Sequence, residues 1–232
     1  MRISVIIPVL GEEAIINGAI DRIRAMDGAI EIVVVDGDPQ GRTLKAVTPD
    51  RALLVACEAG RGRQMNRGVR AAGGEILVFL HADTELPANA FRSISSVVLK
   101  GRFAGGAFDL AIDAKGPIFR VIEWVASFRS RLTRIPYGDQ AIFLRRDRFI
   151  RIGGYRDIPL MEDVDLMRRL RAGGDRIFII HEKVKTSARR WEQEGVLRCT
   201  ARNWAIMLLY LLGVPPERLA RWYASFRSPS AG

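Results

Sequence analysis

The sequence lacks the features that mark several common classes of protein. Its 232 residues include only two cysteines, Cys57 and Cys199, so we expect no disulfide framework and favour a reducing compartment, the cytoplasm. The apolar run at residues 3–7 is too short for the apolar core of a signal peptide and is typical of a first strand. The apolar stretch at residues 203–214 has about a dozen residues, whereas a helix that crosses a bilayer needs about 20.

Phosphate-binding loops of the common kinds are also missing. No Walker A motif and no Gly-x-Gly-x-x-Gly motif follows the first expected strand, which excludes P-loop and dinucleotide-binding proteins. A nucleotidyltransferase remains a rival, but the turn after that strand has no glycine-rich basic loop, as such enzymes usually have.

Lysine is scarce in a strongly basic chain. Only five of the 36 basic residues are lysine, and the formal net charge is +10. Arginine pairs with phosphate and carboxylate through two parallel hydrogen bonds, so this bias suits phosphorylated ligands, nucleic acid or an anionic membrane surface. A genomic preference for arginine codons explains it equally well. The arginines are scattered and not grouped with exposed aromatic side chains, so we expect no nucleic-acid partner.

The most informative segment is an apolar run at residues 76–80 that ends at His81 and Asp83. Such a run predicts a strand that is buried on both faces of a parallel sheet. Ligands bind beyond the carboxyl ends of these strands, and a carboxylate there can hold Mg²⁺ or Mn²⁺ against substrate phosphates. For Asp83 alone, a turn residue before Pro87 is the simpler interpretation.

The first half of the chain alternates strands and helices. Strands are expected at residues 3–9, 31–36, 52–57 and 76–80, with helices at 16–26, 42–47 and 64–72. This order predicts an α/β fold with a mostly parallel central sheet flanked by helices. Right-handed crossovers place the strand ends on one edge, so Asp36, a flexible basic loop with Arg61 and Arg63, and Asp83 should share a cleft.

The second half is expected to mix helices with antiparallel strands. Helices are predicted at residues 87–99, 119–134, 147–152 and 164–172, and strands at 105–112 (antiparallel), 138–145 and 177–180. We expect residues 1–194 to form one domain and residues 195–232 a helical tail. The tail segment 203–223 either packs on the domain or in a homodimer contact, which we slightly favour, or lies peripherally in a membrane interface.

Several short motifs follow one another in a characteristic order. They are Ile-Ile-Pro-Val-Leu-Gly-Glu (6–12), Val-Val-Val-Asp-Gly (33–37), Asn-Arg-Gly (66–68), Phe-Leu-His-Ala-Asp (79–83), Gly-Gly-Tyr (153–155) and Glu-Asp (162–163). Across residues 3–191 this set resembles the family 2 glycosyltransferases, inverting enzymes with the GT-A fold. The nearest resemblance is to small bacterial members with His-Ala-Asp and with Arg-Arg-Trp, here residues 189–191.

The resemblance implies a nucleotide-diphosphosugar donor, with UDP-sugars favoured, and a divalent metal, Mn²⁺ or Mg²⁺. In this family the carboxylate at Asp36 accepts a hydrogen bond from the donor base. The turn from Pro8 to Glu13 contacts base and ribose, with Glu12 as the best candidate. Asp83 corresponds to the metal-binding carboxylate. The family usually has Asp-x-Asp here, so His81 replaces the first acid, which questions its usual part in binding nucleotide or metal. The acceptor, a lipid or a small molecule, is left open.

The resemblance also assigns the proton-transfer and acceptor side. Asp163 corresponds to the catalytic base, and Glu162 orients the acceptor or pairs with an arginine. By themselves the two acids would be ordinary residues of a helix N-terminus. We further expect Asp139 and Gln140, just before a strand, to touch the acceptor.

Three arginines and a tryptophan complete the candidate site. Arg61 and Arg63 either share the charge of the donor phosphates or belong to a solvated loop. Arg190 and Trp191 resemble a family element near the acceptor or pyrophosphate, where the arginine pairs with phosphate and the indole stacks on a sugar. A protein that binds sugar nucleotides without transferring the sugar is the remaining alternative, suggested by His81.

Overall fold

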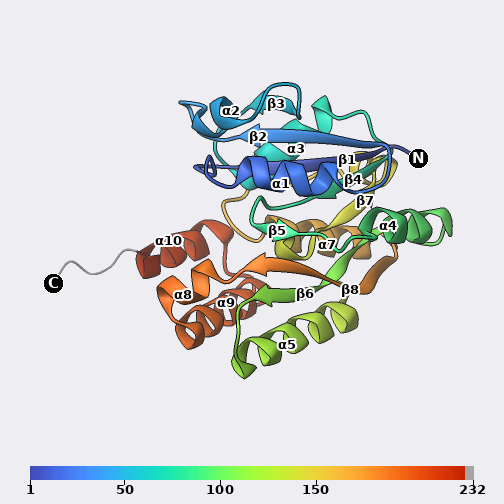
Figure 1. Ribbon diagram of the computed structural model, residues 1–232. Coiled ribbons are helices and arrows are strands. Elements are labelled where there is room, and N and C mark those ends of the chain that lie inside the picture. Colours follow the sequence, from blue (N-terminus) through green and yellow to red (C-terminus); the bar gives the residue numbers. More distant parts are fainter. Residues whose placement is uncertain (228–232) are drawn as a thin grey trace.

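The computed structural model describes residues 1–227 and contains an eight-stranded mixed sheet with helices on both faces (Figure 1). The strands are β1 (Ile3–Val9), β2 (Ile30–Asp36), β3 (Leu53–Ala56), β4 (Ile76–Phe79), β5 (Thr84–Glu85), β6 (Gly105–Asp113), β7 (Phe143–Arg145) and β8 (Ile177–Ser187). The helices are α1 (Ile16–Arg24), α2 (Arg42–Ala46), α3 (Arg61–Ala71), α4 (Ala90–Leu99), α5 (Pro117–Thr133), α6 (Arg146–Arg151), α7 (Glu162–Ala172), α8 (Arg189–Glu194), α9 (Val196–Leu211) and α10 (Pro216–Arg227), with a 3-10 turn η1 (Gly138–Gln140).

The first four strands form the parallel part of the sheet. The strand order is β3-β2-β1-β4-β7-β6-β8-β5, and β1 pairs in parallel with both β2 and β4. The apolar runs of β1, β2 and β4 are buried on both faces, as the sequence predicted, whereas the edge strand β3 is largely exposed. The α/β class with a mostly parallel sheet is therefore confirmed.

Alternate residues of β1 supply two apolar layers. Ile7 packs in the layer covered by α1, α4 and α5, whereas Ile6 packs in the layer covered by α3, α6 and α7. Helix α3 approaches the sheet at Gly68, where an added Cβ would lie 2.5 Å from Cγ2 of Ile6. A larger side chain there would push α3, and its first turn at the sheet edge, away from β1.

The second half differs from its predictions in two strands. Strand β7 runs antiparallel between β4 and β6, but β6 also pairs in parallel with β8. The predicted strand at residues 138–145 is wrong for its first part, which forms η1. The side chain of Gln140 accepts a hydrogen bond from the Tyr137 N–H and donates one to the Phe108 carbonyl, so local bonds turn this segment.

Strand β8 is much longer than the predicted strand at residues 177–180. It reaches Ser187 because its second part continues to pair with β6 after a register shift at Phe108/Asp109. This extension takes Thr186 and Ser187 to the edge of the sheet near His81 and Asp83, and β5 pairs with the same end of β8.

Helix boundaries also correct the sequence prediction near the site. Arg61 and Arg63 were predicted in a flexible loop, but they lie in the first turn of α3, where the N–H of Gln64 bonds to the carbonyl of Gly60 at 2.8 Å. The predicted tail from residue 195 onward contains helices α9 and α10, and α9 buries Cys199 and Ile206 against the rest of the protein. Residues 228–232 lie outside the described part of the chain. No helix within residues 1–227 is long and apolar enough to cross a membrane.

Candidate active site

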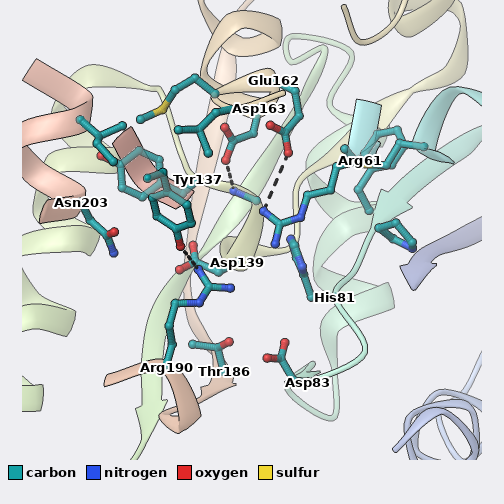
Figure 2. A pocket seen from close by; sticks show the side chains of 18 of the residues that line it. Arg61, His81, Asp83, Tyr137, Asp139, Glu162, Asp163, Thr186, Arg190 and Asn203 are labelled. Atoms are coloured by element: carbon teal, nitrogen blue, oxygen red, sulfur yellow. Dashed lines mark hydrogen bonds and ion pairs between the residues drawn. The ribbon is translucent and has the colours of Figure 1, made fainter. Parts of the chain in front are cut away.

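A pocket of about 430 Å³ opens at the carboxyl end of β4. One side, which we call the sheet wall, consists of Pro8, Arg61, His81 and Asp83. The other side, the helix wall, consists of Glu162, Asp163, Arg190, Asn203 and Tyr223. Figure 2 shows Arg61, His81 and Asp83 facing Arg190 and Asn203 across the pocket, with Glu162 and Asp163 at its upper end. Asp83, the expected metal-binding acid, and Asp163, the expected base, both belong to this lining.

Asp163 is held by backbone hydrogen bonds. Its Oδ2 accepts the N–H of Gly138 at 2.5 Å, and its Oδ1 accepts the N–H of Val164 at 2.7 Å. Burial raises the pKa of Asp163, although these two N–H groups and the charge of Arg61 oppose that shift. A carboxylate that is oriented by two fixed donors and has a raised pKa is well suited to accept a proton.

Glu162 lies beside Asp163 at the start of α7. Only 6% of Glu162 is exposed, and its Oε1 lies 4.0 Å from Nη1 of Arg61 on the sheet wall. Burial, together with the charge of Asp163, raises the pKa of Glu162 to about 7. The preceding Met161 has a left-handed backbone, with φ of 66°, which is uncommon for a residue with a side chain. With this backbone conformation just before α7, both Glu162 and Asp163 lie in the pocket lining.

Gly138 lies where the two walls meet. A Cβ at this position would lie 3.1 Å from Nε2 of His81 and 3.4 Å from Oδ2 of Asp163. Burial, followed by the charges of Arg61 and Arg190, lowers the pKa of His81 to about 3, so its imidazole is neutral near neutral pH. His81 therefore brings hydrogen-bonding capacity to the pocket but no charge.

Asp139 points into the middle of the pocket from η1 (Figure 2). Its Oδ1 is buried and has no hydrogen-bond partner among the described residues. Burial raises the pKa of Asp139 to about 6, and the charge of Asp163 adds to this effect. A buried carboxylate oxygen without a partner is costly, so a ligand with an N–H, O–H or cation is the natural partner for it.

A divalent cation at the sheet wall would have to be shared between Asp83 and the phosphates of a substrate. Asp83 is partly exposed in the pocket, and its carboxylate makes no hydrogen bond or ion pair with any residue up to 227. Within that same part of the chain, no three His, Cys, Asp or Glu side chains are grouped to hold an ion. Mg²⁺ is commonly held by one or two carboxylates together with substrate phosphates, and Asp83 suits that arrangement.

Helix α8 brings cations and an indole to the pocket. Arg190 and Trp191, both at the start of α8, are part of the lining, and their predicted contact with acceptor or pyrophosphate stays a prediction. Nη1 of Arg190 lies 3.5 Å from the hydroxyl of Tyr223 on α10. Trp191 packs edge-on against Phe119 and donates from its Nε1 to Thr200, so packing already fixes its orientation.

Four of the predicted site residues lie outside the pocket lining. Arg63 is exposed and forms ion pairs at 2.8 and 2.7 Å with two surface acids. Gln140 is fully buried and positions η1 through its side chain instead of meeting the pocket. Glu12 lies just beyond the edge, where its Oε1 is 3.5 Å from Nη2 of Arg189, a lining residue.

Asp36 is the fourth of these residues. It has no exposed surface, and its carboxylate accepts the N–H groups of Asp38 and Leu44, at 2.9 and 3.3 Å. In this conformation Asp36 therefore organises the loop after β2. Its predicted contact with a nucleotide base stays a prediction.

Sequence reasoning missed several lining residues. Tyr137 stacks under the guanidinium of Arg129, 3.7 Å from its ring centre, and burial raises the pKa of Tyr137 to about 12, so the hydroxyl keeps its proton. Asn203 and Tyr223 come from α9 and α10, which no pattern connected to the strand ends. The polar Asn203 within an apolar helix was the one available signal. His181, the second histidine of the chain, is exposed on β8 and is not part of the lining.

Comparisons with known proteins identify a family for the sequence and similar structures for the fold. A sequence model described as glycosyl transferase family 2 matches residues 4–157. Comparison with curated proteins gave no match. Among solved structures, a mannosyltransferase from Pyrobaculum calidifontis in complex with GDP-Man and Mn²⁺ is similar with a TM-score of 0.66 and 20% identity, over 97% of this chain and 69% of that one.

A second similar structure is residues 1–349 of TarS from S. aureus in complex with UDP-GlcNAc. The TM-score is 0.63 at 17% identity, over 81% of this chain. This chain spans only 58% of the length of that TarS fragment. At these identities the likeness concerns the fold.

Proposed function

This chain belongs to glycosyl transferase family 2, as its motifs predicted, and we propose that it transfers a sugar from a nucleotide-diphosphosugar to an acceptor hydroxyl with inversion. The main observation in support is that Asp83 and Asp163, from distant parts of the sequence, line one pocket. Their surroundings suit two different roles, binding a cation and accepting a proton. The Asp83 carboxylate is unpartnered within residues 1–227, whereas Asp163 is oriented by two N–H groups.

Asp163 acts as the base in this proposal. The acceptor oxygen attacks the anomeric carbon, its proton passes to the Asp163 carboxylate, and the bond from that carbon to the phosphate oxygen breaks. The electron pair leaves with the nucleoside diphosphate. Because Gly138 and Val164 fix the carboxylate, the proton acceptor keeps its position throughout the reaction.

The sheet wall and Arg190 receive the donor phosphates. Arg61 and Arg190 both line the pocket and supply fixed positive charge beside the leaving group. A divalent cation on Asp83 would act as a Lewis acid that neutralises the departing diphosphate. Pro8 is our proposed contact for the base and ribose of the donor. Glu12 and Asp36 belong to the same proposed contact, but their loops must shift before these side chains reach the donor.

The donor base is the least constrained part of this proposal. A uridine donor is favoured by the family resemblance and is consistent with the UDP-GlcNAc bound to TarS. The GDP-Man bound to the Pyrobaculum enzyme makes guanosine the first alternative. The second candidate function, binding of a sugar nucleotide without transfer, is favoured only by the neutral His81 in place of an acid.

The test combines binding and turnover on the full chain. Thermal unfolding is measured with UDP and GDP, each with and without Mn²⁺. Hydrolysis of the corresponding sugar nucleotides is then measured as the release of nucleoside diphosphate. We expect one nucleotide to raise the melting temperature, more so with Mn²⁺, because a ligand of the native state stabilises it. Binding without any release of nucleoside diphosphate would favour the binding protein, and no binding at all would reject the proposal.

A further inference from the structure

Helix α9 has two faces with different surroundings. Cys199, Arg202 and Ile206 are buried on one face, and Asn203 and Ile206 line the active-site pocket. The opposite face is apolar and exposed: Leu197, Trp204, Leu208 and Leu211 repeat at helical spacing and are 77%, 56%, 59% and 51% exposed. A single helix is therefore a wall of the pocket on one side and an uncovered apolar stripe on the other.

The segment that contains this stripe is mostly basic. Residues 196–224 contain four arginines and a single acid, Glu217. Of these arginines, Arg202 is buried in an ion pair with Glu194, whereas Arg198, Arg218 and Arg221 are exposed and have no ion pair with any residue of the described chain. An exposed apolar helix face in a segment with exposed, unpaired arginines suits an interface between water and anionic lipid.

A second exposed apolar stripe, on α5, provides a comparison. Trp124 and Phe128 are 66% and 52% exposed and stack with ring centres 5.4 Å apart. Most arginines beside that stripe are already engaged: Arg120 pairs with Glu123, Arg131 pairs with Asp109, and Arg129 lies over the ring of Tyr137. Only Arg134, at the helix end, is an exposed arginine of this segment without an ion pair among the described residues. Helix α5 contributes no residue to the pocket lining. Charge and position therefore favour α9 over α5 as the lipid contact.

We propose that α9 and α10 dock on an anionic membrane surface through the exposed face of α9 and through Arg198, Arg218 and Arg221. Docking there places the bilayer directly against the outer side of a pocket wall. Given the proposed function, the acceptor hydroxyl then belongs to an amphipathic lipid that reaches the pocket past Asn203 and Tyr223. A peripheral contact of this kind needs no helix that spans the bilayer.

Sedimentation of the full chain with vesicles tests the docking. Vesicles of phosphatidylcholine alone are compared with vesicles of equal parts phosphatidylcholine and phosphatidylglycerol, at low and high salt. We expect binding to the anionic vesicles only, weakened by salt. Trp204→Ser/Leu208→Ser should weaken it by roughly tenfold or more, because two exposed apolar side chains are lost from the contact.

Trp124→Ser/Phe128→Ser on α5 is the matched control, because it removes a similar exposed apolar area, and it should bind vesicles as the wild type does. Nucleotide binding, measured by thermal shift without lipid, should be unchanged in both variants. This separates failure of the docking from failure of the proposed function.

Three results would overturn the docking proposal. The first is unchanged vesicle binding in the α9 variant, and the second is an equal loss in the α5 control. The third is absence of vesicle binding together with a dimer that the α9 variant turns into a monomer in analytical ultracentrifugation. That last result would assign the stripe to a second copy of the chain.

Discussion

The two walls of the pocket are built in different ways. The sheet wall has His81 and Asp83 directly after β4, the strand that pairs with β1 in the middle of the sheet. The helix wall combines the start of α7 with side chains from α8, α9 and α10. Strand geometry therefore fixes one wall, whereas the other depends on packing between segments that are far apart in sequence.

The acids of the two walls differ in the same manner. The carboxylate of Asp83 has no partner among the described residues and is free to take a ligand. The carboxylate of Asp163 is already engaged by two N–H groups, and Met161 before it adopts an uncommon backbone conformation. The uncommon backbone of Met161 and the two fixed hydrogen bonds indicate that the position of the Asp163 carboxylate is what matters, and not whether it is free to bind a ligand.

The largest expected effect is on the helix wall. Asp163→Asn removes the proton acceptor but keeps the size of the side chain, so kcat should fall by about 10²–10⁴-fold. Nucleotide affinity should stay the same, because Asp163 itself is not one of the proposed phosphate contacts, which are Arg61, Arg190 and a cation on Asp83. Steady-state kinetics and calorimetric titration with the nucleoside diphosphate measure the two quantities. A variant that loses nucleotide affinity yet keeps its kcat would show that Asp163 has a binding role.

The corresponding change on the sheet wall should be smaller and should depend on metal. Asp83→Asn should lower kcat/KM by about 10²–10³-fold, because the charge stabilisation of the leaving group is lost, and should remove the response to Mn²⁺. Glu85→Gln, two residues further along and outside the pocket lining, is the control and should change neither quantity. If Asp83→Asn still responds to Mn²⁺ as the wild type does, the cation binds elsewhere.

Gly138 tests the place where the walls meet. In Gly138→Ala the new methyl group would lie 3.1 Å from His81 and 3.4 Å from Asp163, so one of them must move by a few tenths of an ångström. We expect about a tenfold loss of kcat with little change in melting temperature, since small displacements of reacting groups are costly. Gly18→Ala on α1, where the Cβ meets only ordinary contacts, is the control. Full activity in Gly138→Ala would show that the two walls are not held in register there.

The sequence predicted the sheet wall better than the helix wall. Apolar runs located β1, β2 and β4, and the right-handed crossover rule placed their ends together. However, the apolar runs could not show which of two acids faces the pocket. Asp36 and Asp83 both follow buried strands, yet Asp36 is sealed by its own loop and Asp83 faces the pocket. Loop hydrogen bonds decide between these outcomes, and strand periodicity contains no information about them.

The helix wall was predicted only where a motif marked it. Glu162 and Asp163 came from the family resemblance, but Tyr137 and Asn203 had no local pattern that linked them to the site. Their positions follow from how η1 and α9 pack, and such long-range packing leaves little trace in neighbouring residues. The predicted acceptor contact of Gln140 illustrates the limit, since its side chain is buried in hydrogen bonds that build the turn.

A smaller effect concerns the pH dependence of the helix wall. Burial and the charge of Asp163 raise the pKa of Glu162 to about 7. The wild-type profile of kcat/KM should therefore show an inflection near that pH, with a severalfold change across it. Glu162→Gln should remove this inflection, because the variant side chain cannot ionise. An inflection that persists in the variant would assign it to another group.

The smallest effect is expected in stability, at the acid between the walls. The folded-state pKa of Asp139 is raised from 3.8 to about 6, so its contribution to stability is fully present below pH 3.8 and is lost as the pH rises through about 6. Asp139→Asn cannot ionise and avoids this loss. Its free energy of unfolding should exceed that of the wild type by about 1–2 kcal/mol above pH 7, and the difference should shrink toward zero near pH 4. Urea denaturation across this pH range measures it, with the exposed Asp27→Asn as a control that should show no difference. A gain in stability paired with a loss of activity would mean that the pocket keeps a buried, unpartnered carboxylate oxygen for its ligand, whereas a destabilised variant would mean that this oxygen already has a partner in solution.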